Sequence, residues 1–95
     1  MKDLREPVEQ MTSADYKERF KAEYWQTKIR YEKLKAFNTR IEAANAVSHE
    51  TKRTIVEMPE HDCPEWVLRE QQTLMGNYLH MLEIRALIEG IDICE

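Results

Sequence analysis

Three polar residues recur at seven-residue spacing in the C-terminal third of the chain: Gln71, Tyr78 and Arg85. On an α-helix this spacing places them along one stripe, near the middle of a broad apolar face. An amide, a phenol and a guanidinium can together bind an anion or order a neighbouring helix. Because buried polar groups are costly without partners, the stripe predicts contact with another chain, with a polar part of the first helix, or with a ligand.

Arg85 has the most specific chemistry of the three residues. In one interpretation it pairs with a glutamate of the first helix and fixes the register of a helical assembly. In the other it faces the axis of an oligomer, where symmetry repeats it as a ring of positive charge that requires an anion. The sequence leaves both interpretations open.

A second pattern lies in the first half of the chain, where Tyr24 and Tyr31 alternate with four lysines. These are Lys17, Lys21, Lys28 and Lys35, which fall within a narrow arc of a helix. A solvated face explains them, and Lys28 with Glu32 forms an i,i+4 pair. Aromatic rings beside fixed cations also suit a nucleotide, which offers a base for stacking and a phosphate for charge pairing.

Metal binding and catalysis are not predicted. His61, Asp62 and Cys63 are adjacent, but structural zinc sites pair their ligands in two separate clusters, so a polar loop with a capping aspartate is favoured. Cys63 has no assignable histidine and third orienting group. The chain also has no nucleophile elbow, phosphate-binding loop or dinucleotide fingerprint, so we expect no enzyme activity and no cofactor.

Composition predicts a single all-α domain. The 95 residues are 42% hydrophobic and 34% charged, with two Gly and three Pro, which suits long helices. The net charge of −4 argues against binding to a DNA or RNA polymer. Residues 15–42, however, hold eight Lys/Arg against five Asp/Glu, and such a basic helix in an acidic protein could attract a small anion.

Location is predicted from the cysteines and from hydropathy. Two cysteines in a chain without a signal peptide suggest free thiols in a reducing cytoplasm. No apolar run approaches the roughly 18 to 20 residues that a membrane span requires. We therefore expect a soluble cytoplasmic protein with no membrane partner.

The first helix is predicted over residues 15–43, after an N-terminal arm at 1–14 and a cap at Thr12 or Ser13. It has two apolar faces about 150° apart. The larger comprises Phe20, Tyr24, Thr27, Tyr31, Leu34 and Ile41, and the smaller comprises Ala22, Trp25, Ile29 and Ala36. An antiparallel hairpin covers only one face, so the second predicts self-association into a compact homo-oligomer.

A long connection is predicted at 44–64, with a possible helical turn over 48–56. Asp62 and Glu65 resemble a capping box around Pro64, which opens a second helix at 64–89. Gly90 is placed to end that helix before a tail at 90–95. The second helix has two apolar edges: Leu68, Met75, Leu79, Leu82 and Ala86 form one, and Val67, Leu74, Met81 and Ile88 form the other.

Two runs of this predicted hairpin resemble a known family. They are Tyr31 to Phe37 (YEKLKAF) and Glu70 to Arg85 (EQQTLMGNYLHMLEIR). Both are similar to the phage-encoded helical hairpin shared by anti-CBASS and Thoeris anti-defence sponge proteins. The runs cover about a quarter of the chain and are helix-packing patterns. The connection at 44–64 is longer than in the shorter family members, which puts the pocket walls in question.

The resemblance implies oligomers, often hexamers, that sequester cyclic di- or trinucleotides made by bacterial immune systems without cleaving them. For the dinucleotide site it implies an aromatic residue, Tyr24 or Trp25, and a basic residue, Arg40, with Asn38 beside it. Lys28 is a further candidate ligand residue, because it is one of the four lysines that lie beside Tyr24 and Tyr31. For the trinucleotide site the resemblance implies Arg85. The alternative prediction is a helical module that binds another protein through the face of Trp25 and Ile29.

Overall fold

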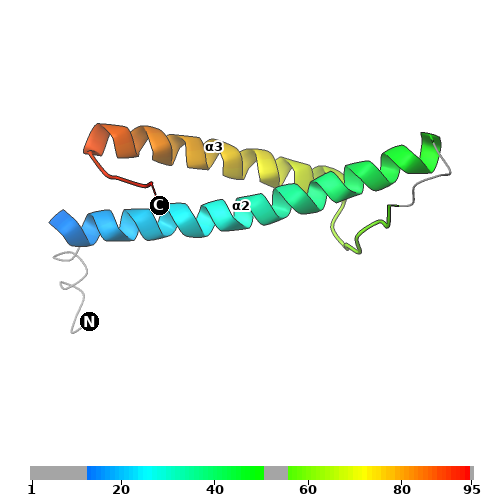
Figure 1. Cartoon of the computed structure of the whole chain (residues 1–95), viewed down its shortest axis with the longest axis horizontal. Helices are drawn as coiled ribbons and strands as arrows, with labels where there is room; N and C mark the ends of the chain where they lie inside the picture. Colours follow the sequence, from blue (N-terminus) through cyan, green and yellow to red (C-terminus); the bar gives the residue numbers. More distant parts are fainter. Residues whose placement is uncertain (1–12, 51–55, 95) are drawn as a thin grey trace.

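The chain folds as a hairpin of two antiparallel helices in the computed structural model, which describes residues 13–50 and 56–94 (Figure 1). Helix α2 spans Ser13–Glu50 and helix α3 spans Glu65–Glu89. The described residues contain no strand, so the predicted all-α hairpin is confirmed. The predicted arm at 1–14 and the cap at Thr12 lie almost wholly outside the described residues.

Helix α2 is longer than predicted, because it continues past residue 43 to Glu50. Its 38 residues span roughly 57 Å at 1.5 Å per residue. The sequence from 44 to 50 contains no Gly or Pro, so the helix continues although the apolar periodicity is lost after residue 43. Residues 51–55, part of the predicted helical turn, lie outside the described residues.

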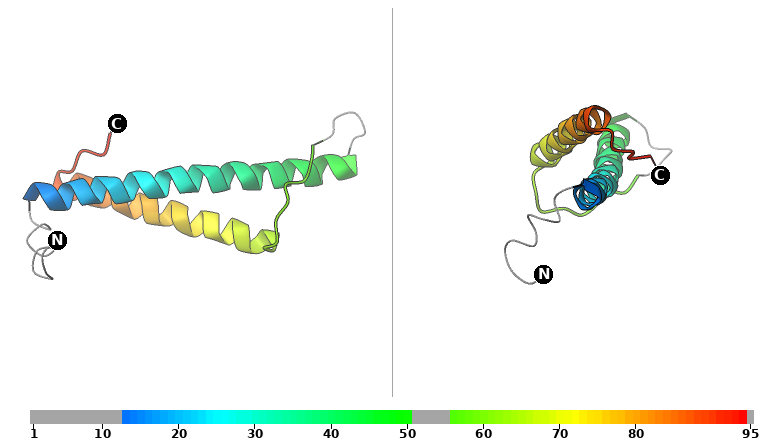
Figure 2. Two further views of the ribbon diagram at one scale, coloured as in Figure 1. Left: turned by 90° about the horizontal axis from the view of Figure 1, so that it is seen from below. Right: turned by 90° about the vertical axis from the view of Figure 1, so that its left-hand side faces the viewer.

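The segment 56–64 returns from the far end of α2 to the start of α3 (Figure 2). Pro59 is buried, and the ring of His61 packs edge-on against Phe37 with centroids 6.0 Å apart. His61 Nδ1 also lies 2.8 Å from the carbonyl oxygen of Pro59. The connection is therefore packed against the helix before it reaches α3.

The start of α3 differs from the predicted capping box. Pro64 occupies the N-cap position without a side-chain cap, and its carbonyl accepts hydrogen bonds from the backbone N–H groups of Val67 (3.1 Å) and Leu68 (3.2 Å). Glu65 turns toward α2 instead, where its Oε1 accepts a 3.2 Å hydrogen bond from the Asn45 amide. The capping box of Asp62 and Glu65 is therefore wrong.

The end of α3 is as predicted. Gly90 adopts the left-handed conformation (φ 69°, ψ 33°), and the N–H of Ile91 donates a 2.8 Å hydrogen bond to Ala86 O. Only a residue without a Cβ adopts this conformation at little cost. The turn directs the tail back across α2, where Ile91 is buried and the Ile93 carbonyl accepts a 3.0 Å hydrogen bond from Trp25 Nε1.

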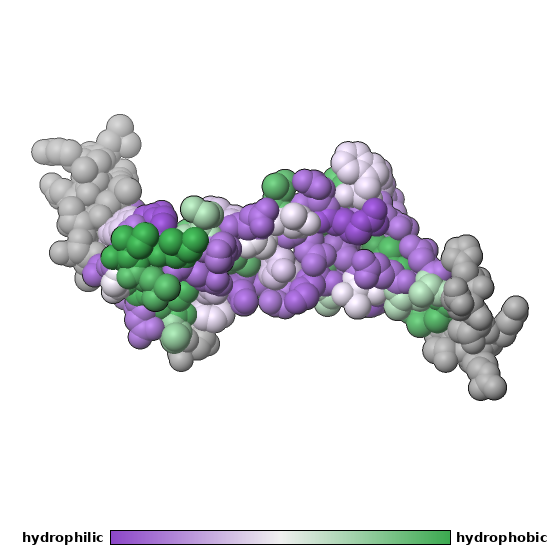
Figure 3. Space-filling model, turned by 90° about the horizontal axis from the view of Figure 1, so that it is seen from above, coloured by the Kyte–Doolittle hydropathy of each residue, from purple (hydrophilic) through white to green (hydrophobic). Residues whose placement is uncertain are grey.

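The core lies between the larger apolar face of α2 and one edge of α3. Its buried cluster consists of Phe20, Tyr24, Leu79, Leu82, Ala86 and Ile91. The two faces were predicted, but the contribution of Ile91 was not. The other edge of α3 has no partner in the hairpin: Leu74, Met81 and Ile88 are 58%, 55% and 77% exposed. Figure 3 shows the apolar surface that gathers over the C-terminal end of α3.

Candidate functional site

Three tyrosine–carboxylate hydrogen bonds cross between the helices, and those of Tyr24 and Tyr78 run in opposite directions. Tyr24 on α2 donates to Glu83 Oε2 at 2.8 Å, and Tyr78 on α3 donates to Glu23 Oε2 at 3.1 Å. Burial, together with the hydrogen bond to Glu83 and the charge of that carboxylate, raises the pKa of the Tyr24 phenol to about 12. Both phenols therefore remain protonated donors at neutral pH.

Arg85 lies at the end of the hairpin where α2 begins. Its Nε donates a 2.9 Å hydrogen bond to Glu89 Oε2, and its guanidinium lies over the Phe20 ring, 5.0 Å from the centroid. Tyr16 donates a 3.0 Å hydrogen bond to Glu89 and also contacts the Arg85 guanidinium. Glu89 raises the pKa of Arg85, and Arg85 lowers that of Glu89.

The first of the two interpretations, in which Arg85 pairs with a glutamate of the first helix, is therefore wrong within this chain. Its carboxylate partner, Glu89, is one turn further along its own helix, whereas the contact from the first helix is the phenol of Tyr16. The Arg85 side chain is 45% exposed, so one side of the guanidinium stays open to solvent. An anion could contact Arg85 without displacing Phe20 from beneath it.

Two of the predicted ligand residues lie in the interior. Asn38 is buried, and its amide donates to the Leu68 carbonyl (3.1 Å) and to Gln72 Oε1 (2.9 Å). Its Oδ1 is buried and accepts no hydrogen bond within the described part of the chain. Tyr24 is similarly buried in the core cluster. Both residues hold the two helices together within this chain.

The other predicted α2 residues lie on the outer surface. Trp25 packs edge-on against Tyr24, with centroids 5.2 Å apart, and its indole N–H is held by the tail. Lys28 follows within one turn and pairs with Glu32 at 3.6 Å. Arg40 is exposed beside a shallow depression. It lies 15 residues after Trp25, which is about 22 Å along the helix. One protomer thus groups Trp25 with Lys28, but not with Arg40 or Arg85.

The lysine pattern is largely paired within its own helix. Lys21 lies 3.3 Å from Glu18, Lys28 pairs with Glu32, and the Lys35 ammonium lies 6.0 Å from the centroid of the Tyr31 ring. Exposed pairs of this kind contribute little to stability. They agree with the solvated-face interpretation and leave the cations accessible to an anion.

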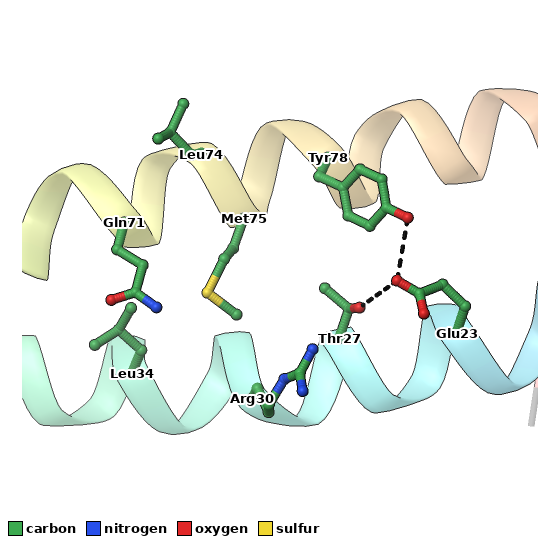
Figure 4. Close-up of a pocket in the computed structure, with 8 residues that line it drawn as sticks. All are labelled: Glu23, Thr27, Arg30, Leu34, Gln71, Leu74, Met75 and Tyr78. Carbon is green, nitrogen blue, oxygen red and sulfur yellow. Dashed lines mark hydrogen bonds between the residues drawn. The ribbon is translucent and has the colours of Figure 1, made fainter.

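A groove of about 580 Å³ runs between the middle parts of α2 and α3 (Figure 4). Its lining residues are Glu23, Thr27, Arg30, Leu34, Gln71, Leu74, Met75 and Tyr78. Glu23 accepts hydrogen bonds from Tyr78 and, at 3.3 Å, from Thr27 at one end of the groove. Arg30 lies in the middle, and Gln71 lies toward the other end beside Leu34 (Figure 4).

Arg30 was missed from the sequence. In the described part of the chain, neither its guanidinium nor the amide of Gln71 forms a hydrogen bond or ion pair with another residue. Arg30 follows Glu23 by seven residues, the same interval that relates Gln71 to Tyr78 on the opposite helix. This shared interval could have predicted the groove residue Arg30, because it places one polar stripe on each helix.

Other kinds of site find little support in residues 13–50 and 56–94. No three His, Cys, Asp or Glu side chains there are grouped to hold a metal ion. Cys63 and Cys94 are both free thiols. Neither α2 nor α3 combines the length and apolarity needed to cross a membrane.

Comparison with known proteins gives one result. The family model described as Sequestin matches residues 14–88, which include nearly all of both helices and the connection between them. No curated protein and no solved structure is significantly similar to the chain. The family is named for sequestration, not for a catalysed reaction. Because the match covers most of its length, the chain belongs to the Sequestin family.

Proposed function

We propose that this protein is a phage-encoded sponge that sequesters cyclic oligonucleotide immune signals without cleaving them. Its ligands are cyclic dinucleotides, cyclic trinucleotides or both, and binding in the host cytoplasm blocks CBASS-type or related anti-phage signalling. The observation that carries this proposal is the match of residues 14–88 to a family named for sequestration. The resemblance of the two helix runs to sponge proteins supplies the ligand class.

The charge distribution supports a small anionic ligand. The basic segment 15–42 lies in an otherwise acidic chain, so net positive charge is concentrated in α2. The half-buried Lys28, one turn from Trp25, and Arg30, which has no partner among the described residues, are accessible to phosphate. A long nucleic acid would require a continuous basic surface instead.

Side-chain exposure divides the six predicted ligand residues into two roles. We assign direct ligand contact to the four whose side chains reach the surface, namely Trp25, Lys28, Arg40 and Arg85. The buried side chains of Tyr24 and Asn38 then position these groups by joining the helices. Arg40 and Arg85 lie far from Trp25 in one protomer, so their sites would require neighbouring copies.

Self-association is part of the proposal, with a hexamer favoured by the resemblance. The exposed edge formed by Leu74, Met81 and Ile88 supports it, because a lone hairpin leaves this apolar edge in water. These residues recur every seven positions, as in the seam of a helical bundle. The tail partly covers the other predicted surface, around Trp25.

The alternative function is a helical module that binds a host or phage protein. The same exposed edge of α3 favours it, since an amphipathic partner helix could pack there as well as another copy could. A pull-down that recovers a protein partner in a one-to-one complex with the monomeric hairpin would support this alternative.

Thermal unfolding with a panel of cyclic di- and trinucleotides tests the proposed function. A ligand at about 100 times its Kd stabilises the folded state by about 2.7 kcal/mol, which raises the melting temperature by several degrees. Linear dinucleotides of the same base composition serve as controls. If no member of the panel raises the melting temperature, the proposed function is wrong.

A further inference from the structure

The interhelical groove places a carboxylate and a guanidinium along one line of α2. Glu23 and Arg30 are seven residues apart, about 10 Å along the helix at 1.5 Å per residue. Both line the groove, and Thr27 lies between them (Figure 4). The groove thus has an acceptor at one end and a cation near its middle, a separation comparable with that between the base edge and the phosphate of a nucleotide.

Arg30 provides the anion-binding group of the groove. Its guanidinium has no hydrogen bond or ion pair with another described residue, so no partner in this part of the chain must be displaced. Arginine binds phosphate with two parallel hydrogen bonds, which fix orientation as well as charge. The apolar side chains of Leu34 and Met75 line the same groove.

Glu23 provides the base-reading group. An ionised carboxylate only accepts hydrogen bonds, and this one already accepts from Tyr78 and Thr27 through a single oxygen, Oε2. Oε1 accepts no hydrogen bond from another residue in the described part of the chain. The Watson–Crick edge of guanine presents two adjacent donors, whereas that of adenine presents one donor beside an acceptor. A carboxylate therefore complements guanine and places its charge against the adenine acceptor.

The remaining walls suit a flat base. The side chain of Tyr78 is 44% exposed, and the thioether of Met75 lies on the same side of α3 (Figure 4). Aromatic rings stack on bases of any sequence, and a thioether adapts to an aromatic face. Tyr78 and Met75 therefore provide affinity for any base, whereas Glu23 and Arg30 select the base and bind the phosphate.

We propose that this groove is a nucleotide subsite selective for guanine, in which Arg30 binds a phosphate and Glu23 accepts hydrogen bonds from the base. The assignment rests on the proposed function and extends it by naming the preferred base and the residues that select it. It also gives a role to Gln71, whose amide lies beyond Arg30 and can bind the sugar or the second phosphate of a cyclic dinucleotide.

Calorimetric titration of the full chain with cyclic di-GMP and with cyclic di-AMP tests the assignment. We expect the wild-type protein to bind cyclic di-GMP about tenfold more tightly, because guanine presents donors to Oε1 where adenine presents an acceptor beside its donor. Glu23→Gln should remove or reverse this preference, because an amide complements adenine. Arg30→Ala should weaken both ligands by similar factors. Lys33→Ala, on an exposed part of α2, is the matched control and should change neither affinity.

The outcomes separate this inference from the function on which it rests. Equal or tighter binding of cyclic di-AMP by the wild-type protein, or an unchanged preference in Glu23→Gln, overturns the groove assignment while sequestration stands. If the wild-type protein binds neither ligand nor any cyclic trinucleotide, both proposals are wrong. Circular dichroism and melting temperature establish that each variant folds, and Glu23→Asp, which keeps the charge, should retain a preference for guanine.

Discussion

The phenol of Tyr24 on α2 donates a 2.8 Å hydrogen bond to the carboxylate of Glu83 on α3. A second bond of the same kind runs the other way, from Tyr78 to Glu23, at 3.1 Å. Leu and Ile side chains can slide past one another, but two such bonds are satisfied together in only one register. The pair therefore sets how the exposed and groove-lining residues of the two helices face each other.

Tyr24→Phe should destabilise the hairpin by about 1 to 2 kcal/mol, because it leaves the partly buried carboxylate of Glu83 without its donor. Urea unfolding followed by circular dichroism measures the change. Tyr31→Phe is the matched control, since no hydrogen bond joins its hydroxyl to another described residue. Equal stability losses in the two variants would show that the Tyr24 bond contributes nothing specific.

Stability should fall in alkali through the pH range set by Tyr24. Its folded pKa of about 12 lies above the ordinary value of 10, so the protonated phenol favours the folded state. This contribution is complete below pH 10, decreases as the unfolded chain loses its proton, and is gone above pH 12. Urea midpoints measured between pH 8 and 11 should fall more steeply for the wild-type protein than for Tyr24→Phe. Parallel curves would contradict the prediction.

Ile91→Ser should release the tail and lower stability by about 2 kcal/mol or more, because it removes a buried core side chain. The released tail would free the Trp25 indole, whose emission should shift to the red. Trp66, which is 65% exposed, would be replaced by Phe so that only Trp25 reports. Unchanged emission would mean that the tail does not cover Trp25 in solution.

The sequence predicted the parts of the fold that depend on periodicity. The core faces of both helices and the role of Gly90 follow from residue spacing and from one special backbone angle. The end of α2 was placed seven residues too early, because the residues after Ala43 lose their apolar pattern but remain helix formers. The predicted capping box of Asp62 and Glu65 is wrong because Glu65 accepts a hydrogen bond from Asn45 instead. Local sequence does not show this contact, since the two residues are 20 positions apart.

The candidate site was harder to predict, since it depends on how two helices face each other. Arg85 was recognised as unusual, but its partner Glu89 was missed although it stands four residues away. Asn38 was placed among ligand residues because of its neighbours in sequence, whereas its side chain points into the hairpin. Arg30 is not predicted as a site residue, because the sequence of one helix does not show which charged residue borders a groove between two helices.

Met81→Lys should reduce the native mass of the assembly while leaving the helical content unchanged. The side chain is 55% exposed in the hairpin, so a lysine there costs the protomer little but would place a charge in an α3 interface. Ile29→Lys, at a side chain 53% exposed on α2, is the matched comparison. If only Ile29→Lys dissociates the protein, the interface lies on α2 instead.

In the proposed function the protein holds a cyclic oligonucleotide and releases it intact. The most direct measurement is mass spectrometry of small molecules freed by heat from protein purified from cells that make these signals, together with the native mass of the assembly. The proposed function predicts an intact cyclic di- or trinucleotide, bound stoichiometrically to a homo-oligomer. Recovery of linear or hydrolysed nucleotide, or of no nucleotide from a protein that also fails to bind the purified ligands, would contradict it.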